Sequence, residues 1–312
     1  MMHHISNHLQ THYPIEIAAI QPAARGLVAE TFLATSHTGQ RFFVKVNAKP
    51  FFKNRLRQSA PAHAALAATL GHGVNQPVAT RTGEWISVLG PSMVTISQYI
   101  DAPNSEQYDT SAFGRLIGQI HQATARITTP IQRVSTFEHD AIWRQLMARV
   151  YRPGTTSWQA QLNERMQPWR TLIAEHYDDL NALQRNYAQH AHDWVITHGD
   201  AGGNVVANNA TNLTIVDWDY LALAHPERDL WVFRDDTAFW RGYLEAVPHY
   251  QRDDYQLQLA AYRQYFDYMV FILCEIYLSP DDIDRQPHID NLLSLFDENN
   301  WIQCRLGHAS RF

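Results

Sequence analysis

The sequence has few cysteines, no run of basic residues and no long apolar segment. Only Cys274 and Cys304 occur among 312 residues, outside any metal-ligand spacing. A disulfide framework is therefore not expected, and a reducing cytoplasm is the predicted compartment.

The sequence has 25 basic and 31 acidic residues, which gives a formal net charge of -6. It therefore lacks the excess of basic residues that is typical of a nucleic-acid-binding protein. The longest uncharged apolar stretch, Tyr268–Cys274, is far shorter than the ~20 residues of a membrane span. Neither a nucleic acid nor a membrane is an expected partner.

The first hundred residues have the pattern of a small sheet with one helix. Segments rich in β-branched and aromatic residues predict five strands, at Tyr13–Ile20, Glu30–Thr35, Arg41–Asn47, Trp85–Leu89 and Met93–Tyr99. An alanine-rich segment predicts a helix over Arg57–Leu70 that ends at Gly71. In the third strand, Lys45 shares one face with Phe43 and Asn47, because side chains alternate along a strand.

From Thr110 the pattern becomes helical, with one exception. Apolar residues at helical spacing predict helices at Ser111–Ala125, Ala141–Tyr151, Ala160–His190, Glu227–Ala246, Asp254–Leu278 and Asp282–Phe296. The exception is Trp194–Trp218, where short strand-like pieces flank a glycine-rich loop. The sequence thus predicts an α+β fold with two lobes. Residues 1–98 would form a small five-stranded lobe, and residues 99–312 a larger, mostly helical lobe.

The densest group of polar residues lies in the segment THGDAGGNVVANNATNLTIVDWD, Thr197–Asp219. It places five polar side chains at the ends of short strands: His198, Asp200, Asn204, Asp217 and Asp219. Phosphoryl transfer uses such a set, because one carboxylate accepts the proton of the attacking hydroxyl while an amide and a second carboxylate hold Mg²⁺ against the phosphates. Glycines 202 and 203 permit a tight loop that brings Asn204 back beside Asp200. The HGD tripeptide alone is also typical of a turn, but its order after Lys45 and before Asp217 favours a kinase.

These segments resemble the aminoglycoside phosphotransferase family, whose wider group includes spectinomycin, choline, homoserine and fructosamine kinases. THGDAGGN resembles the HxDxxxxN loop of the family, and VDWD followed by ALAHPERDL is similar to its IDWD/E–(x)n–DL segment. FFVKVN resembles a fructosamine-kinase strand, and GRLIGQIHQ resembles the lG-x-x-La-x-lH helix of the family. The resemblance is patchy but ordered along nearly the whole chain, and only the HGD and DWD blocks are specific.

The resemblance implies a protein-kinase-like fold and an ATP- and Mg²⁺-dependent kinase. The acceptor would be a hydroxyl of a metabolite or of an aminoglycoside- or aminocyclitol-like molecule. Asp200 would be the catalytic base, His198 would orient its loop, and Asp229 would support that loop from the following helix. Asn204 and Asp217 would be the metal ligands. The implied ATP contacts are Lys45 on the phosphates, Gly26 in the phosphate-covering loop, and Ser97, Gln98, Tyr99 and Ile100 as the hinge that reads adenine.

Two departures from the family pattern keep an alternative open. The loop between the expected base and the expected amide ligand holds three residues, Ala201–Gly203, where the family has four. No acidic residue occurs in residues 31–83, so the helix glutamate that normally pairs with the strand lysine is missing for Lys45. Gln58 or His63 would be a neutral substitute. The alternative is a kinase-like protein with weak or no catalysis that binds a nucleotide or another ligand.

Histidines and aromatic residues suggest two further sites. Pairs such as His190/His192 and His3/His4 lack both the i, i+4 spacing and the nearby cysteines of a zinc site, which favours a solvated surface. Aromatic and acidic residues gather in the C-terminal helices: Trp231, Asp235, Asp236, Trp240, Tyr243, Tyr265, Tyr268 and Glu275. Their spacing favours core packing, while a pocket for an amine-bearing substrate stays open. The choice between ATP and GTP, and between monomer and homodimer, also stays open.

Overall fold

The computed structural model describes residues 2–23, 29–102, 108–187, 194–278 and 284–306, which belong to two compact units. The first unit comprises Met1–Arg133, Trp194–Ala224 and Asp235–Tyr250. The second comprises Val134–Asp193, His225–Arg234 and Gln251–Phe312. The expected lobe boundary after residue 98 stays a prediction.

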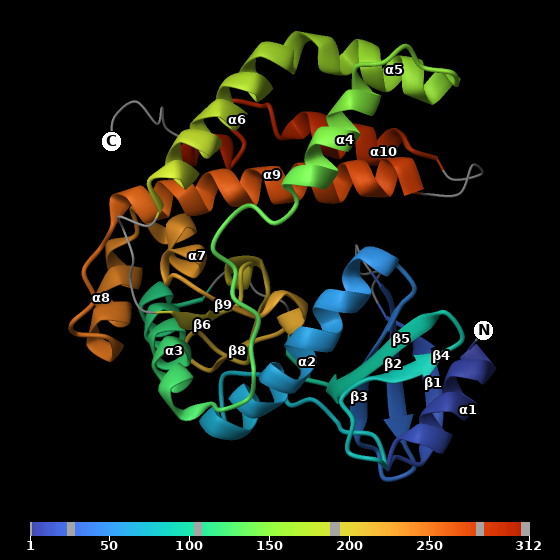
Figure 1. Ribbon diagram of the computed structural model, residues 1–312. Coiled ribbons are helices and arrows are strands. Elements are labelled where there is room, and N and C mark those ends of the chain that lie inside the picture. Colours follow the sequence, from blue (N-terminus) through green and yellow to red (C-terminus); the bar gives the residue numbers. More distant parts are fainter. Residues whose placement is uncertain (1, 24–28, 103–107, 188–193, 279–283, 307–312) are drawn as a thin grey trace. The chain divides into compact units, whose positions relative to one another are not determined.

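A five-stranded antiparallel sheet forms the N-terminal part of the first unit (Figure 1). Its strands are β1 (Ile17–Pro22), β2 (Glu30–Ser36), β3 (Arg41–Asn47), β4 (Ser87–Leu89) and β5 (Ser92–Gln98), in the order β1-β2-β3-β5-β4. The predicted strand over Arg41–Asn47 is confirmed at both ends. It is the central strand, in which Lys45 lies between Thr31 of β2 and Thr95 of β5.

The two faces of this sheet have different surroundings. Phe42 and Val44 belong to an apolar core that also includes residues of α1 (Met2–His12). Phe43 and Lys45 alternate with them along β3 and line a cavity on the other face. The predicted alternation is therefore confirmed, and it directs the ammonium group of Lys45 into the cavity.

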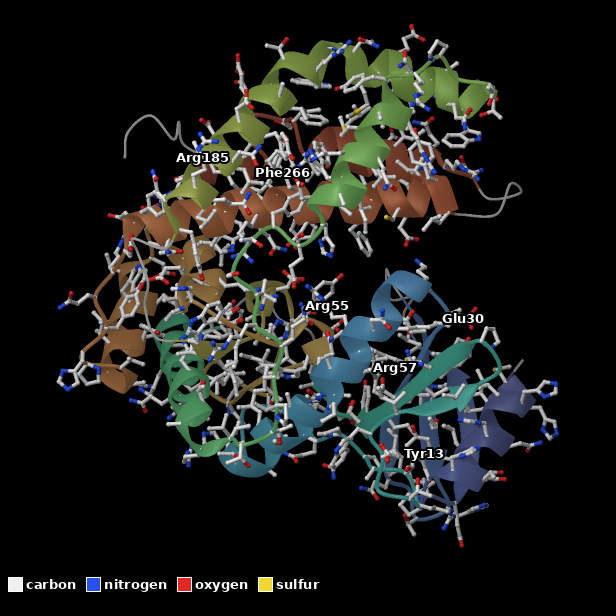
Figure 2. The ribbon with its side chains drawn as sticks, in the orientation of Figure 1. Tyr13, Glu30, Arg55, Arg57, Arg185 and Phe266 are labelled. Atoms are coloured by element: carbon white, nitrogen blue, oxygen red, sulfur yellow. The ribbon has the colours of Figure 1, made fainter. Side chains whose placement is uncertain are left out.

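Helix α1 is not predicted from the sequence, because MHHISNHLQTH is polar and rich in histidine. Ile5 and Leu9 lie one turn apart and are almost completely buried. Tyr13, labelled in Figure 2, continues this spacing. Its hydroxyl donates to the Val94 carbonyl oxygen at 3.0 Å. The i, i+4 spacing of these apolar residues is the signal for the helix.

Helix α2 (Pro50–Leu70) begins seven residues before its predicted start at Arg57. Proline suits the first turn of a helix, since its missing N–H has no helical partner there. The predicted end is confirmed: Gly71 adopts the left-handed conformation (φ 71°), and its N–H donates to the Ala67 carbonyl.

Two small ribbons carry the glycine-rich segment. β6 (Val195–Thr197) pairs with β9 (Ala222–Ala224), and β7 (Val205–Ala207) pairs with β8 (Leu213–Ile215). The three strand-like pieces expected in this region are confirmed, whereas β9 is not predicted.

Helices make up most of the remaining described residues. They are α3 (Thr110–Ala123) and α8 (Thr237–Ala246) in the first unit, and α4 (Asp140–Val150), α5 (Ser157–Met166), α6 (Arg170–Arg185), α7 (Glu227–Leu230), α9 (Asp254–Leu278) and α10 (Gln286–Ser294) in the second. Among the described helices, none is both long and apolar enough to cross a membrane. The α+β fold class, with a five-stranded sheet and a mostly helical remainder, is confirmed.

Two predicted helices are interrupted. The segment predicted as one helix over Ala160–His190 contains a 3₁₀ turn at Gln167–Trp169, where a proline removes a helical N–H. The segment predicted over Glu227–Ala246 breaks before Asp236, whose side chain accepts from the Phe239 N–H and so begins α8.

Helices α3 and α8 approach each other to backbone contact. A Cβ atom at Gly114 would lie 2.2 Å from the Phe239 carbonyl oxygen, and one at Gly242 would lie 1.8 Å from the Ser111 carbonyl oxygen. Farther along, Nδ1 of His121 is 2.9 Å from the Tyr243 hydroxyl. The glycines of the GRLIGQIHQ segment therefore serve this close packing.

We expect Gly242→Ala to lower the free energy of unfolding by about 1–3 kcal/mol, because the added methyl group collides with the α3 backbone. Urea denaturation measures this loss. Gly203→Ala is the control, since nothing lies within 4 Å of a Cβ atom there. A Gly242→Ala protein as stable as the wild type would contradict the close approach of the two helices.

Candidate active site

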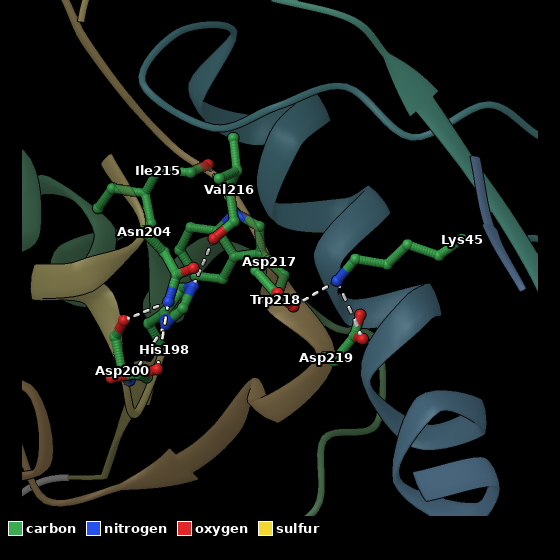
Figure 3. Close-up of polar contacts among 9 residues, drawn as sticks. All are labelled: Lys45, His198, Asp200, Asn204, Ile215, Val216, Asp217, Trp218 and Asp219. Atoms are coloured by element: carbon green, nitrogen blue, oxygen red, sulfur yellow. Dashed lines mark hydrogen bonds and ion pairs between the residues drawn. The ribbon is translucent and has the colours of Figure 1, made fainter. Parts of the chain in front are cut away.

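The glycine-rich loop folds back so that its first and last polar side chains meet. Ala201–Gly203 forms a 3₁₀ turn, closed by a bond from the Asn204 N–H to the Ala201 carbonyl at 3.1 Å. The side-chain amide of Asn204 donates to the Asp200 backbone carbonyl at 2.7 Å and to its carboxylate at 3.3 Å (Figure 3). The prediction that the glycines bring Asn204 beside Asp200 is confirmed, despite the shortened loop.

The β7–β8 hairpin places Asp217 close to this loop. Val216 directly follows β8, and its N–H donates to the Asn204 carbonyl at 2.9 Å, which extends the ladder by one pair. Asp217 is the next residue and adopts the left-handed conformation, with φ 66° and ψ 57°. It is the one non-glycine residue with positive φ in the described part of the chain. Aspartate tolerates this region better than most residues.

His198 connects the two segments that carry these acids. Its Nε2 donates to the Val216 carbonyl at 2.8 Å, and its Nδ1 accepts from the Asp200 N–H at 3.1 Å. These partners fix the tautomer, because a carbonyl only accepts and a backbone N–H only donates. The ring is buried, with the Trp218 ring against it at 4.7 Å between centroids. His198 thus bridges the two segments, and both ring nitrogens already have partners.

Lys45 has two carboxylate partners, whereas the sequence suggested only a neutral partner on the helix, Gln58 or His63. Its Nζ lies 2.5 Å from Asp217 Oδ1 and 3.1 Å from Asp219 Oδ2 (Figure 3). Neither expected substitute takes part in this pairing: Gln58 is exposed, and His63 bonds to a backbone carbonyl. The lysine partner therefore comes from the turn after β8 and not from α2.

Electrostatics couple these three groups. Burial opposes the charge on Lys45, but the two carboxylates outweigh it and raise its pKa above the ordinary value. Burial likewise opposes the charge on Asp217, and Lys45 holds the pKa of this carboxyl below its usual range. Burial raises the pKa of Asp219, and the charge of Asp217 adds to this effect. One ammonium faces two carboxylates, so this place favours a further cation.

These side chains line a cavity of about 440 Å³ within the first unit. This volume is within the range of small-molecule sites. The walls come from the sheet, α2, the segment after β5 and the turn after β8; they include Thr31, Lys45, His63, Asn75, Asn204 and Asp217. Among the described residues, Oδ1 of Asn75 is buried without a hydrogen-bond partner. It offers an acceptor to an N–H or O–H group of a ligand.

The expected hinge also lines the cavity, through Ser97, Gln98, Tyr99 and Ile100. Part of its backbone is already bonded: the Tyr99 N–H donates to the Arg41 carbonyl at 3.0 Å, and the Gln98 N–H donates to the Gln76 carbonyl at 2.8 Å. Among the described residues, no backbone hydrogen bond outside the strand ladders uses the Gln98 carbonyl or the Ile100 N–H. The hinge therefore retains one acceptor and one donor two residues apart.

Two expected site residues are not brought into this group. Gly26 lies outside the described residues. Asp229 is buried in α7, in the second unit, so its expected support of the catalytic loop stays a prediction. Sequence reasoning gave no role to Asp219 or Asn75. The absence of acidic residues in residues 31–83 could have indicated that the partner of Lys45 comes from a later segment such as the one with Asp219. No sequence pattern marks Asn75.

The oxygen donors suit a magnesium ion. Asn204 uses its NH₂ group toward Asp200, which leaves its amide oxygen for a cation, and Asp217 supplies a carboxylate. Mg²⁺ in phosphoryl-transfer sites takes one or two carboxylates plus substrate phosphates. The ammonium of Lys45 on Asp217 shows that a cation is stabilised there. In the part of the chain that the structure describes, no group of three or more His, Cys, Asp or Glu is arranged to hold a metal ion.

Several solved structures share this fold at low sequence identity. Spectinomycin phosphotransferase APH(9)-Ia, in complex with ADP and spectinomycin, has a TM-score of 0.75 and 18% identity, with 98% of this chain and 97% of that chain covered. A microcompartment-associated aminopropanol kinase has a TM-score of 0.63 and 14% identity, with 93% of each chain covered. Choline kinase LicA from Streptococcus pneumoniae has a TM-score of 0.60 and 14% identity, with 93% and 98% covered.

The sequence itself matches a family of enzymes. No curated protein matches the chain. Residues 19–264, well over half of the chain, match the phosphotransferase enzyme family. This range includes the strand that carries Lys45, the glycine-rich loop and the DWD turn, and it confirms the resemblance that these segments indicate. The chain therefore belongs to the phosphotransferase enzyme family.

Proposed function

We propose that this protein is an ATP- and Mg²⁺-dependent kinase that transfers the γ-phosphate to a hydroxyl group of a small molecule. One observation carries the proposal. Lys45 of the sheet and the distant Asn204 and Asp217 at the two ends of the β7–β8 hairpin line one cavity, and Asp200 is hydrogen-bonded to Asn204. This is the set of groups that phosphoryl transfer requires.

Each group has a distinct role in the proposed reaction. The exposed carboxylate of Asp200 accepts the proton of the acceptor hydroxyl, whose oxygen attacks the γ-phosphorus while ADP leaves. Lys45 donates to the phosphates and offsets their charge. Asp217 and Asn204 would hold Mg²⁺, which supplies further positive charge at the phosphate oxygens.

The hinge supports ATP over GTP. The Gln98 carbonyl is an acceptor that suits the 6-amino group of adenine, and the Ile100 N–H is a donor that suits adenine N1. Guanine presents the opposite pattern at these two positions, an acceptor followed by a donor. Two of the similar structures contain ADP or AMP-PNP, which supports an adenine nucleotide.

The acceptor differs widely among the similar proteins, whose names refer to spectinomycin, aminopropanol, amicoumacin and choline. Function belongs to the site and not to the fold, so none of these acceptors transfers directly to this chain. An ATP-consumption screen over sugars, amino alcohols, fructosamines and aminocyclitol antibiotics tests the proposal. ATP consumption above the background with any one acceptor supports it.

A protein that binds nucleotide without catalysis is the competing function. Two features suggested it, the shortened loop and the missing helix glutamate. In the structure, Asn204 still bonds to Asp200 across the shortened loop, and Asp219 pairs with Lys45 in place of a helix glutamate. Thermal shift measures binding separately from turnover. A ligand present at a hundred times its dissociation constant stabilises the folded state by ~2.7 kcal/mol. Stabilisation by ATP together with no turnover in the full screen would favour the binding protein.

We expect Asp200→Asn to lower kcat by about 10²–10⁴-fold, because the amide does not accept the hydroxyl proton. The KM for ATP should change little, since Asp200 is not among the residues that line the cavity. Steady-state kinetics of both substrates measure the two constants. A loss confined to KM would make Asp200 a binding residue.

Asp217→Asn should raise the Mg²⁺ concentration at half-maximal activity by about ten-fold or more, because a carboxylate ligand becomes a neutral amide. A magnesium titration at saturating ATP measures this shift. Glu245→Gln serves as the control, since Glu245 pairs with Arg115 on an exposed surface of α3 and α8. An unchanged Mg²⁺ dependence would remove Asp217 from the metal site.

A further inference from the structure

The carboxylates that hold Lys45 both come from the turn after β8, while α2 carries none. Helix α2 contains the cations Lys53, Arg55 and Arg57 and no acidic residue. In the usual pairing the helix supplies a carboxylate to the strand lysine. Here the helix carries only positive charges, and the carboxylates come from the turn.

Packing fixes this turn against α2. The Trp218 ring stacks on His63 of α2, with 5.8 Å between centroids, and the Arg55 guanidinium lies 4.5 Å from the centre of the Tyr220 ring. Asp219 lies between these two aromatic residues in the same 3₁₀ turn. Contacts on both sides therefore hold its backbone beside the helix.

The two carboxylates differ in their access to the cavity. The side chain of Asp217 is 41% exposed, whereas that of Asp219 is 22% exposed and that of Lys45 17%. Asp217 also directly follows Val216, which bonds to Asn204 and His198. Both carboxylates contact Lys45, but Asp217 directly follows the residue bonded to Asn204, whereas Asp219 lies within the turn that packs against α2.

We propose that Asp219 is a positioning residue that holds Lys45 in place for the nucleotide phosphates, in the role that a helix carboxylate would otherwise fill. This inference rests on the proposed kinase function. When Asp217 turns its carboxylate to a divalent cation, Lys45 loses one partner and retains Asp219. The lysine then keeps its place in the cavity without a contribution from α2.

Removing the lysine alone, or the lysine together with one carboxylate, should change the stability of the fold to different extents. Lys45→Met leaves two neighbouring carboxylates without a cation, one of them largely buried, which destabilises the fold. Asp219→Asn in the same protein removes one of them and relieves the repulsion. The double variant Lys45→Met/Asp219→Asn should therefore be more stable than Lys45→Met alone, although it carries one more substitution.

Thermal unfolding without ligands tests this pair independently of catalysis. We expect Lys45→Met to lower the midpoint by roughly 5 °C, and the second substitution to restore part of that loss. The reversed order, or losses that simply add, would contradict the Lys45–Asp219 pairing. This test stands even if the protein proves not to be a kinase.

Calorimetric titration of ATP in EDTA tests the positioning role, because affinity without a divalent cation depends on Lys45 and not on the metal. Asp219→Asn should weaken ATP binding roughly ten-fold, by the worth of a charged hydrogen bond. Asp219→Glu should restore much of it, and Glu245→Gln should leave it unchanged. Added to Lys45→Met, Asp219→Asn should cause no further loss, since it acts through the lysine. In steady-state kinetics, the single variant Asp219→Asn should raise the KM for ATP by a larger factor than it lowers kcat.

Other outcomes identify what has failed. An unchanged affinity in EDTA, together with a higher Mg²⁺ requirement, would make Asp219 a metal ligand and overturn the inference. A wild-type protein that binds no ATP with or without Mg²⁺ would contradict the proposed function and with it the positioning role. The thermal cycle would in that case still decide whether Lys45 and Asp219 form a pair.

Discussion

Two hydrogen bonds of one buried histidine join the segments on which the site depends. His198 accepts from the Asp200 N–H and donates to the Val216 carbonyl, so the loop with the expected base and the strand end with Asp217 are bound to the same ring. A displacement of either segment breaks a bond inside the protein, where an unpaired polar group is costly. The positions of the expected base and of the expected metal ligand are therefore coupled through His198.

The shortened loop shows how local geometry compensates for a missing residue. A 3₁₀ turn closes with a bond from residue i+3 to residue i, and the Asn204 N–H makes such a bond to Ala201. Three residues between base and amide are thus enough for one complete turn, after which the chain enters β7. Gly203 has open space at the position of a Cβ atom, so the turn itself does not require glycine there.

Local patterns predicted those parts of the molecule that depend on local interactions. The alternation in RFFVKVN gave β3 and the cavity-facing position of Lys45, and the glycine loop gave the return of Asn204 to Asp200. Helix boundaries were less accurate where a single proline or cap decides them, as at Gln167–Trp169. The partner of Lys45 was not predicted, because it lies 172 residues away and no periodic pattern links the two positions. Helix α1 was missed because its apolar residues are few among histidines.

A lysine that faces inward from the middle of a sheet nevertheless constrains its surroundings. An enclosed ammonium without a partner is unfavourable, so such a lysine implies a nearby acceptor, most effectively a carboxylate. With no acid in residues 31–83, the carboxylate must come from a segment that only the tertiary fold brings near. The DWD turn satisfies this requirement twice, because Asp217 and Asp219 both pair with Lys45. Asp217 is the more exposed of the two carboxylates, which suits it to the proposed metal ion. The absence of a nearby acid could have indicated a distant one, which we did not predict, whereas its position follows only from the packing of the turn against α2 through Trp218 and His63.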